Sequence, residues 1–142
     1  MHVTDLAINK TLGMQLAGLD DGHILELPES PLLLNHVGTV HASVQFALAE
    51  ACSGEFLLRQ LGDEPKVFAV LRRSDVKFRK PANGTLRAVA RFANDESVSA
   101  ELASRGRALI SVFVEIADPH GIVTMTGKYD WFLQRQADAT QP

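Results

Sequence analysis

The longest apolar pattern in the chain runs from residue 42 to residue 61 and predicts one long helix. Ala, Leu, Glu, Gln and Arg dominate this stretch, proline is absent from it, and these residue types favour a helix. Gly62 follows where a helix commonly ends. Because apolar residues occur nearly all round the expected helix, we expect the sheet to cover part of it and a partner subunit to cover the rest.

After residue 66, alternating apolar and polar positions predict four strands. The first spans residues 67–78: Val67 to Leu71 reads as a buried run, and the alternation that follows puts Ser74, Val76 and Phe78 on one face. In the later segments, 85–92, 107–118 and 121–133, the apolar residues also share one face each. These residues are Leu86, Ala88, Ala90 and Phe92; Ala108, Ile110, Val112, Val114 and Ile116; and Val123, Met125, Tyr129, Trp131 and Leu133.

Shorter elements complete the prediction. Residues 12–27 read as two short strands around an Asp21-Gly22 turn, and Pro119 to Gly121 predicts a hairpin turn between the last two strands. The charged stretch 94–106 predicts a short surface helix. The predicted strands are grouped before and after one long central helix rather than alternating with helices. This order predicts an α+β domain with an antiparallel sheet against one face of the helix.

Composition narrows the class of protein. The 142 residues predict a single domain over 1–142, with an ordered core at about 10–133 and a polar C-terminal tail. A net charge of −3 argues against a general nucleic-acid binder, and no apolar run is long enough to span a membrane. Cys52 is the only cysteine, which excludes an intrachain disulfide and a cysteine-based zinc cluster. We therefore expect a cytoplasmic protein without a metal ion or a resident cofactor.

Glu50 lies in the middle of the predicted helix among small and apolar neighbours. Phe46, Ala47, Ser53 and Gly54 stand three and four residues away, so no Lys or Arg neutralises the carboxylate along the helix. A buried, unpaired carboxylate shifts its pKa or finds hydrogen-bond donors, and such groups gather at functional sites. The alternative is that Glu50 faces solvent, as most helical glutamates do.

The expected helix start, at Ala42 or Ser43, offers free backbone N–H groups and the positive end of the helix dipole. Such a position suits a developing oxyanion. Glu50 lies about 10–12 Å further along the helix axis. Since a carbonyl bound at the helix start is too far from Glu50 of the same chain, we expect the Glu50 of a neighbouring subunit to reach it across an interface.

The stretch NHVGTVHASVQFALAEACSG resembles the signature of hotdog-fold acyl-CoA thioesterases of the phenylacetate-pathway (PaaI-like) kind. That signature has an Asn, a Gly, a His-Gly-Gly run and an acid nine residues after the His; here Asn35, His41 and Glu50 take these places. The segments SDVKFRKPANGTL and DPHGIVTMTGKYDWF resemble the strand after the helix and the final hairpin of the family. The resemblance covers roughly residues 10–133.

The resemblance implies a hotdog fold, in which an antiparallel sheet wraps around a long central helix. It also implies a homodimer or homotetramer with active sites between subunits. The implied activity is hydrolysis of an acyl-CoA to the free acid and CoA, so that coenzyme A enters only as part of the substrate. Glu50 would act as general base on water or as nucleophile, Asn35 would orient water or substrate, and His41 would shape the loop. The thioester oxygen would be polarised by backbone amides near Val40, His41, Ala42 and Ser43.

The chain departs from the signature where Ala42 and Ser43 replace the two glycines. Glycine lets a pantetheine arm approach the backbone closely, so the added Cβ atoms would narrow the slot or change substrate preference. Ser43 is also able to cap the helix with its own oxygen. In some members of the family a Ser or Thr from a strand of the partner subunit assists the active site. Leu71 is nearest to that position here, and we consider Ser74 as the residue that would take this role.

Basic residues are concentrated in one part of the chain. Nine of the 14 Lys and Arg, but only four of the 17 acids, lie between Arg72 and Arg107. This asymmetry suits a site for the phosphates of coenzyme A, although a solvated strand face would have the same pattern. The preferred phosphate contacts are Arg72, Arg73, Arg79 and Lys80.

Three other functions stay open at this point. A hotdog dehydratase or hydratase would use a His and an acid facing one another, for which His41 and Glu50 are available. A non-catalytic acyl-CoA-binding protein is favoured by the replacement of the family glycines. An interaction module whose dimer is its whole role is the third. The residue pattern leaves the acyl group open.

Overall fold

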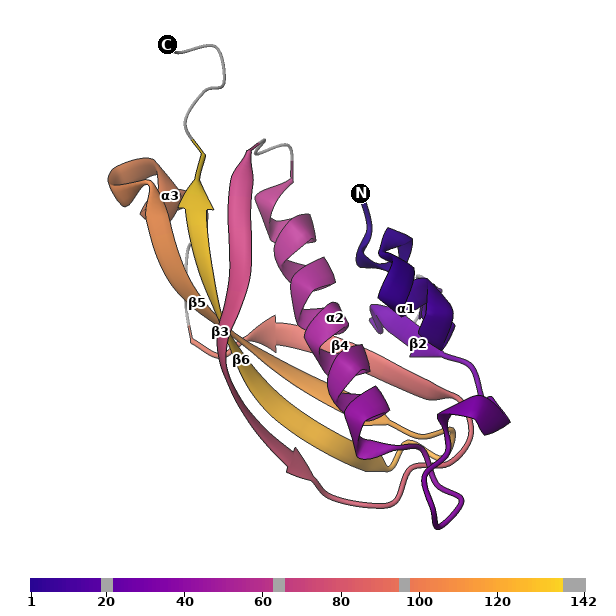
Figure 1. The fold of residues 1–142 in the computed structure, drawn as a ribbon. Helices are drawn as coiled ribbons and strands as arrows, with labels where there is room; N and C mark the ends of the chain where they lie inside the picture. Colours follow the sequence, from indigo (N-terminus) through magenta and orange to yellow (C-terminus); the bar gives the residue numbers. More distant parts are fainter. Residues whose placement is uncertain (19–21, 63–65, 95–97, 137–142) are drawn as a thin grey trace.

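The computed structural model describes residues 1–18, 22–62, 66–94 and 98–136. A six-stranded antiparallel sheet curls around the long helix α2 (Ala42–Leu61), as Figure 1 shows. The strand order is β1-β2-β4-β5-β6-β3. The strands are β1 (Gln15–Leu16), β2 (Leu25–Leu27), β3 (Val67–Phe78), β4 (Leu86–Phe92), β5 (Arg107–Ala117) and β6 (Val123–Arg135). This arrangement confirms the predicted α+β hotdog fold.

Four short helices accompany these elements: η1 (Val3–Asp5), α1 (Ala7–Leu12), η2 (Pro31–Leu33) and α3 (Val98–Arg105). The last of these is the predicted surface helix. The sequence analysis assigned no element to η1 and α1, which pack against α2 on the side away from β3 (Figure 1). Helices this short are unstable alone, so they depend on packing that a local pattern does not reveal.

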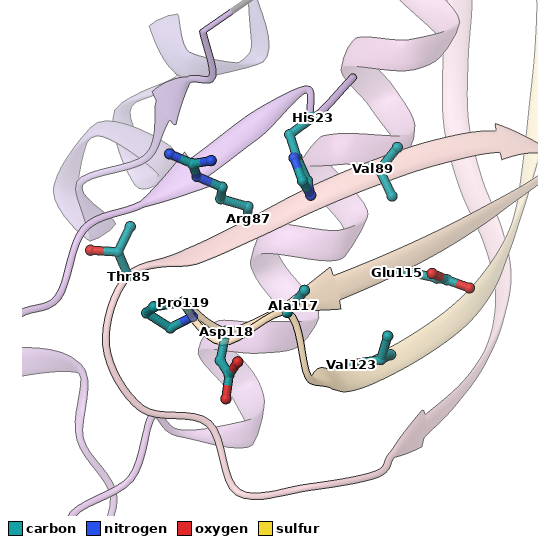
Figure 2. A pocket seen from close by; sticks show the side chains of 10 residues that line it. His23, Thr85, Arg87, Val89, Glu115, Ala117, Asp118, Pro119 and Val123 are labelled. Carbon is teal, nitrogen blue, oxygen red and sulfur yellow. The ribbon is translucent and has the colours of Figure 1, made fainter. Parts of the chain in front are cut away.

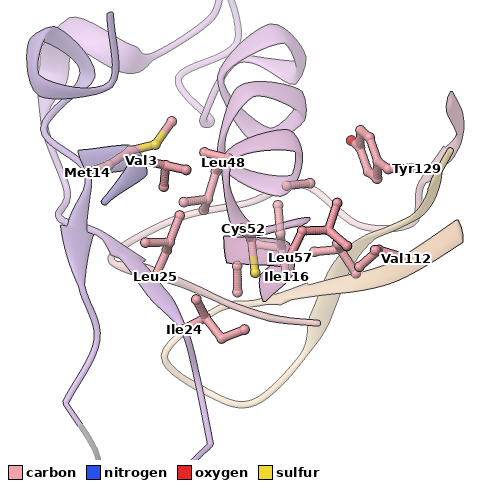
Figure 3. Close-up of a cluster of buried hydrophobic side chains, with 14 of the residues drawn as sticks. Val3, Met14, Ile24, Leu25, Leu48, Cys52, Leu57, Val112, Ile116 and Tyr129 are labelled. Atoms are coloured by element: carbon pink, nitrogen blue, oxygen red, sulfur yellow. The ribbon is translucent and has the colours of Figure 1, made fainter. Parts of the chain in front are cut away.

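Helix α2 begins and ends where the pattern predicted, and the alternating strands line the core below it. Leu48, Cys52 and Leu57 of α2 are buried, and Figure 3 shows them among the side chains of the sheet. The β5 residues predicted to share a face, from Ala108 to Ile116, are all buried. Within the described ranges, no helix is long and apolar enough to cross a membrane.

Strand β3 corrects one expectation. The first half of this strand was predicted to be a buried run, but Phe68 is 46% exposed and Val70 is 37% exposed. The reason is its place in the sheet: β3 lies at the edge and pairs with β6 alone. A twelve-residue edge strand with exposed apolar side chains is the kind of edge that proteins normally cover or pair.

Candidate functional site

The loop before α2 is held by the side chain of Asn35. Its Oδ1 accepts hydrogen bonds from the backbone N–H groups of Val37 and Thr39, at 3.0 and 3.1 Å, and its Nδ2 donates to the hydroxyl of Thr39 at 2.9 Å. The backbone N–H of Val40 then donates to the carbonyl of Ala82 at 2.8 Å. These bonds fasten the loop to itself and to the segment that follows β3.

At the start of α2, three of the four predicted oxyanion amides already have acceptors. Val40 donates to Ala82, the His41 N–H donates to the carbonyl of Leu33 at 2.9 Å, and the Ser43 N–H donates to Nδ1 of His41 at 3.0 Å. The helix is thus capped by His41 rather than by Ser43. For the N–H of Ala42, the described residues provide no acceptor.

Ala42 lines a cavity of about 320 Å³. Five of the residues to which the sequence assigned a site role line it together: Asn35, Val40, Ala42, Arg79 and Lys80. The Arg79 side chain is positioned by a hydrogen bond from its Nε to the hydroxyl of Thr126 at 2.9 Å. Because the guanidinium bonds through Nε, its terminal nitrogens remain available to an anion in the cavity.

Gln45 also lines this cavity, and the sequence analysis did not single it out. The side chain is buried, and its Oε1 accepts a 2.9 Å hydrogen bond from the hydroxyl of Thr124. No described residue accepts from its amide nitrogen, which is left to donate. A glutamine in an apolar helix carries no pattern that marks it, since its position beside Thr124 depends on the fold of β6.

Glu50 is half-buried in α2, on the side of the helix near Tyr129 of β6. In the described part of the chain its carboxylate forms no hydrogen bond or ion pair. Burial raises the pKa of the Glu50 carboxyl above its ordinary value. The pKa of the Tyr129 phenol is raised first by its own burial and then by the charge of Glu50, which places the two side chains near each other.

Ser74 lies across from Tyr129 on the neighbouring strand, so this serine shares the inner face with the surroundings of Glu50. Tyr129 packs against Phe46 with ring centroids 5.5 Å apart. Ser74 is exposed at the open edge of the sheet. The structure therefore places a half-buried acid near a fully buried phenol, with an exposed serine opposite that phenol on the edge strand.

The four predicted phosphate contacts do not lie together. Arg79 and Lys80 line the cavity beside Ala42, whereas Arg72 lines a different cavity with the end of α3 and the start of β5. Arg73 lies opposite Asp130 on β6 and lines neither. Phe78, which lines the cavity at Ala42, stands six residues after Arg72, a distance of about 20 Å along β3.

A further cavity of about 530 Å³ lies on the outer face of the sheet, away from α2 (Figure 2). Arg87, Val89, Glu115 and Ala117 line it, and they alternate with strand residues that face the core. None of the predicted site residues belongs to it. Within the described ranges, no three His, Cys, Asp or Glu side chains are grouped so that they would hold a metal ion.

Comparison with known proteins supplies the family. The family model described as "Domain of unknown function (DUF4442)" matches residues 8–133, most of the chain. The chain belongs to this family. No curated protein matches the chain in sequence.

Solved structures place the family within the hotdog-fold thioesterase superfamily. A protein of unknown function from Pseudomonas aeruginosa, described as a probable thioesterase, is similar over 94% of this chain and 91% of its own, with a TM-score of 0.79 and 25% identity. A thioesterase from Haemophilus influenzae shares the fold over 98% of this chain and 90% of its own, with a TM-score of 0.73 and 16% identity.

A third similar structure contains coenzyme A. This Bacillus halodurans protein, crystallised with CoA, has a TM-score of 0.60 and 25% identity over 77% of the present chain. The match covers 65% of that protein, so the chain spans less than two thirds of its length. With these comparisons, membership of the hotdog-fold thioesterase superfamily is established for the chain.

Proposed function

We propose that this protein is an acyl-CoA thioesterase in which Glu50 activates the attacking water. The observation that carries the proposal is the state of Glu50: a half-buried carboxylate with a raised pKa and no partner in the described chain, near Tyr129 of β6. A structural glutamate in such a place would be expected to have a partner, because an unpaired buried charge destabilises the fold.

The oxyanion site of the proposal is the N–H of Ala42. A thioester carbonyl that accepts from this amide sits at the positive end of the α2 dipole. Water, deprotonated by Glu50, attacks the carbonyl carbon, and the electron pair moves onto the oxygen held by Ala42. The C–S bond then breaks, and CoA leaves as a thiolate that takes up a proton.

The two groups must come from different subunits. Ala42 and Glu50 are eight residues apart in one helix, about 12 Å along its axis, which is too far for a single carbonyl and its attacking water. The long edge strand β3 offers a place for a second copy, because its apolar side chains are exposed and its outer backbone groups pair with no other described strand. We infer a homodimer, or a tetramer built from it, with each site shared between chains.

The cavity beside Ala42 is the proposed entry for coenzyme A. Arg79 and Lys80 bring two positive charges to its wall, and phosphates bind such groups through charge-assisted hydrogen bonds. Asn35 acts here as a positioning residue, because its polar atoms are used within the loop. The CoA-bound Bacillus halodurans structure supports CoA as the ligand class.

Two substitutions test the shared site. Glu50→Gln removes the base without changing shape and should lower kcat about 10²–10⁴-fold. Ala42→Pro removes one N–H while keeping the helix, because proline is favoured at the first helical position. The preceding residue His41, at ψ 139°, already has the conformation that a following proline requires. Loss of this amide should lower kcat about 10²–10³-fold.

Mixing the two inactive variants decides whether the site crosses the interface. In a Glu50→Gln/Ala42→Pro heterodimer, one site has both defects and the other has none, so random mixing should restore about one quarter of the wild-type rate. Sites formed within one chain would stay inactive in every combination. The readout is release of CoA thiol from a panel of acyl-CoAs.

The same panel separates the remaining functions. Addition of water to a crotonyl-type thioester would identify a hydratase. Binding of CoA without turnover of any acyl group would identify a non-catalytic binding protein. Undiminished hydrolysis by Glu50→Gln would exclude Glu50 as the base.

A further inference from the structure

Three arginine residues line one cavity, and among the described residues none of them has a carboxylate partner. Arg72 of β3, Arg105 at the end of α3 and Arg107 at the start of β5 line a cavity of about 250 Å³. In the described part of the chain none of the three forms an ion pair, whereas Arg59 and Arg87 pair with carboxylates at 3.5 and 3.3 Å. Like charges held close together repel, so this arrangement favours a bound anion.

The cavity also has an apolar floor. A register shift between Leu71 and Arg73 makes Arg72 an extra residue in β3, and its guanidinium lies 5.3 Å from the ring centroid of Phe132. Leu109 lies next to this ring and is 62% exposed. A ligand that contacts both the arginines and the apolar side chains of Phe132 and Leu109 carries an apolar or aromatic part beside its anionic group.

Glu101 is the one acid among the described residues that line this cavity, and it does not pair with the arginines. One carboxylate against three guanidinium groups leaves the cavity net positive. A second copy of the chain is disfavoured as the occupant, since a two-fold contact here would bring the same arginines toward one another.

We propose that this cavity binds a phosphate group attached to an apolar or aromatic moiety. Guanidinium groups bind phosphate oxygens in pairs, and a flat group is able to stack beside Phe132. This cavity is distinct from the proposed coenzyme A entry of the same chain, because Arg72 lies about 20 Å along β3 from the cavity at Ala42. A mononucleotide and the headgroup of an anionic phospholipid both present this chemistry.

Calorimetric titration of the full chain with adenosine 5′-monophosphate, adenosine and inorganic phosphate tests the proposal. We expect the mononucleotide to bind, adenosine not to bind, and phosphate alone to bind more weakly. Arg105→Gln/Arg107→Gln should weaken mononucleotide binding at least about tenfold, which is 1.4 kcal/mol. Hydrolysis of acyl-CoA by this variant should be unchanged, which also shows that it folds.

Arg91→Gln is the matched control. Arg91 stacks over Phe113, 4.4 Å from its centroid, on the outer face of the sheet and outside the cavity. Its replacement removes one positive charge from that face and should leave binding within about twofold. An equal loss with Arg91→Gln, or a loss with Arg79→Gln/Lys80→Gln, would overturn the proposal, because the phosphate would then bind elsewhere.

Vesicles of phosphatidylcholine with and without phosphatidic acid distinguish the source of the phosphate. Co-sedimentation with the acidic vesicles that is lost in Arg105→Gln/Arg107→Gln would support the site with a lipid headgroup as its ligand. Binding of neither the mononucleotide nor the acidic vesicles would overturn the proposal. So would dissociation of the oligomer by the double substitution, since the cavity would then be a contact between copies.

Discussion

The carboxylate of Glu55 accepts a 2.9 Å hydrogen bond from the backbone N–H of Val3, although 52 residues separate them. Its second oxygen lies 2.7 Å from Nδ1 of His2 and 3.5 Å from Nε of Arg59. Glu55 is 1% exposed. Glu50, only five residues earlier in the same helix, has no such partners in the described chain. One acid of α2 therefore fastens the N-terminal segment to the helix, and the other is left available.

The Glu55 contacts predict a stability effect. Glu55→Ala leaves the buried Val3 N–H without an acceptor and should lower the free energy of unfolding by about 2–4 kcal/mol. Glu26→Ala is the control, because it removes a more exposed carboxylate paired with Arg87 and should cost less than about 1 kcal/mol. Urea denaturation measures both. Equal losses would show that the N-terminal segment is not fastened by Glu55.

The substitution Glu50→Gln should have opposite effects on the rate of hydrolysis and on the stability of the fold. Burial raises the pKa of this carboxyl above 4.5, so the folded protein holds the proton more tightly than the unfolded chain. The free energy of unfolding therefore falls as pH rises from the pKa of Glu50 in the unfolded chain to its pKa in the folded protein. This loss of stability persists at neutral pH. Glu50→Gln should therefore raise Tm at pH near 7 while it abolishes hydrolysis, and the gain in Tm should vanish below pH 4.5.

The pH–rate profile checks the same group independently. A general base must be ionised, so kcat/KM should fall as pH decreases through the raised pKa, at a higher pH than for an ordinary glutamate. An acid limb at or below pH 4.5 would contradict this environment for Glu50.

Asn35 should act through the loop rather than on the substrate. Asn35→Ala removes the acceptor for two backbone N–H groups and should lower kcat/KM on the order of 10–100-fold by displacing the helix start. Asn35→Asp keeps the accepting oxygen and should retain most of the activity. If both variants lose activity equally, the amide nitrogen has a direct role.

Replacing Gly127 or Gly54 with alanine should have different effects on stability, because the space around the added Cβ differs. A Cβ at Gly127 would lie 2.8 Å from Cε2 of Tyr129 and 3.0 Å from Cγ1 of Val76, so Gly127→Ala should cost about 1–3 kcal/mol. At Gly54 the nearest atom is 3.5 Å away, and Gly54→Ala should be neutral or stabilise α2 by up to about 1 kcal/mol. Thermal unfolding of the two variants gives the comparison.

Periodicity alone predicted most of the fold. Helix α2, the later strands and the inward faces of β4, β5 and β6 follow from patterns that repeat within ten to twenty residues, because each element must turn its apolar side to the core. The place of Ser74 and of Tyr129 on the inner faces of their strands follows from the same alternation, whereas the pairing of the two residues was not predicted. Helix α1 was missed, since its six residues depend on contacts with α2.

The site was decided by tertiary structure wherever a partner comes from far along the chain. The sequence by itself marked Asn35, His41, Glu50, Arg79 and Lys80 as candidates, through residue type and spacing. It did not reveal that, of the four amides proposed for the oxyanion, Ala42 alone lacks an acceptor among the described residues, because the acceptors for its neighbours belong to Leu33, Ala82 and the His41 imidazole. Nor did it show that Glu55 is the more buried acid of α2, or that the start of β3 is exposed. Hydrogen bonds and burial of this kind depend on where distant segments pack, and no local pattern encodes that.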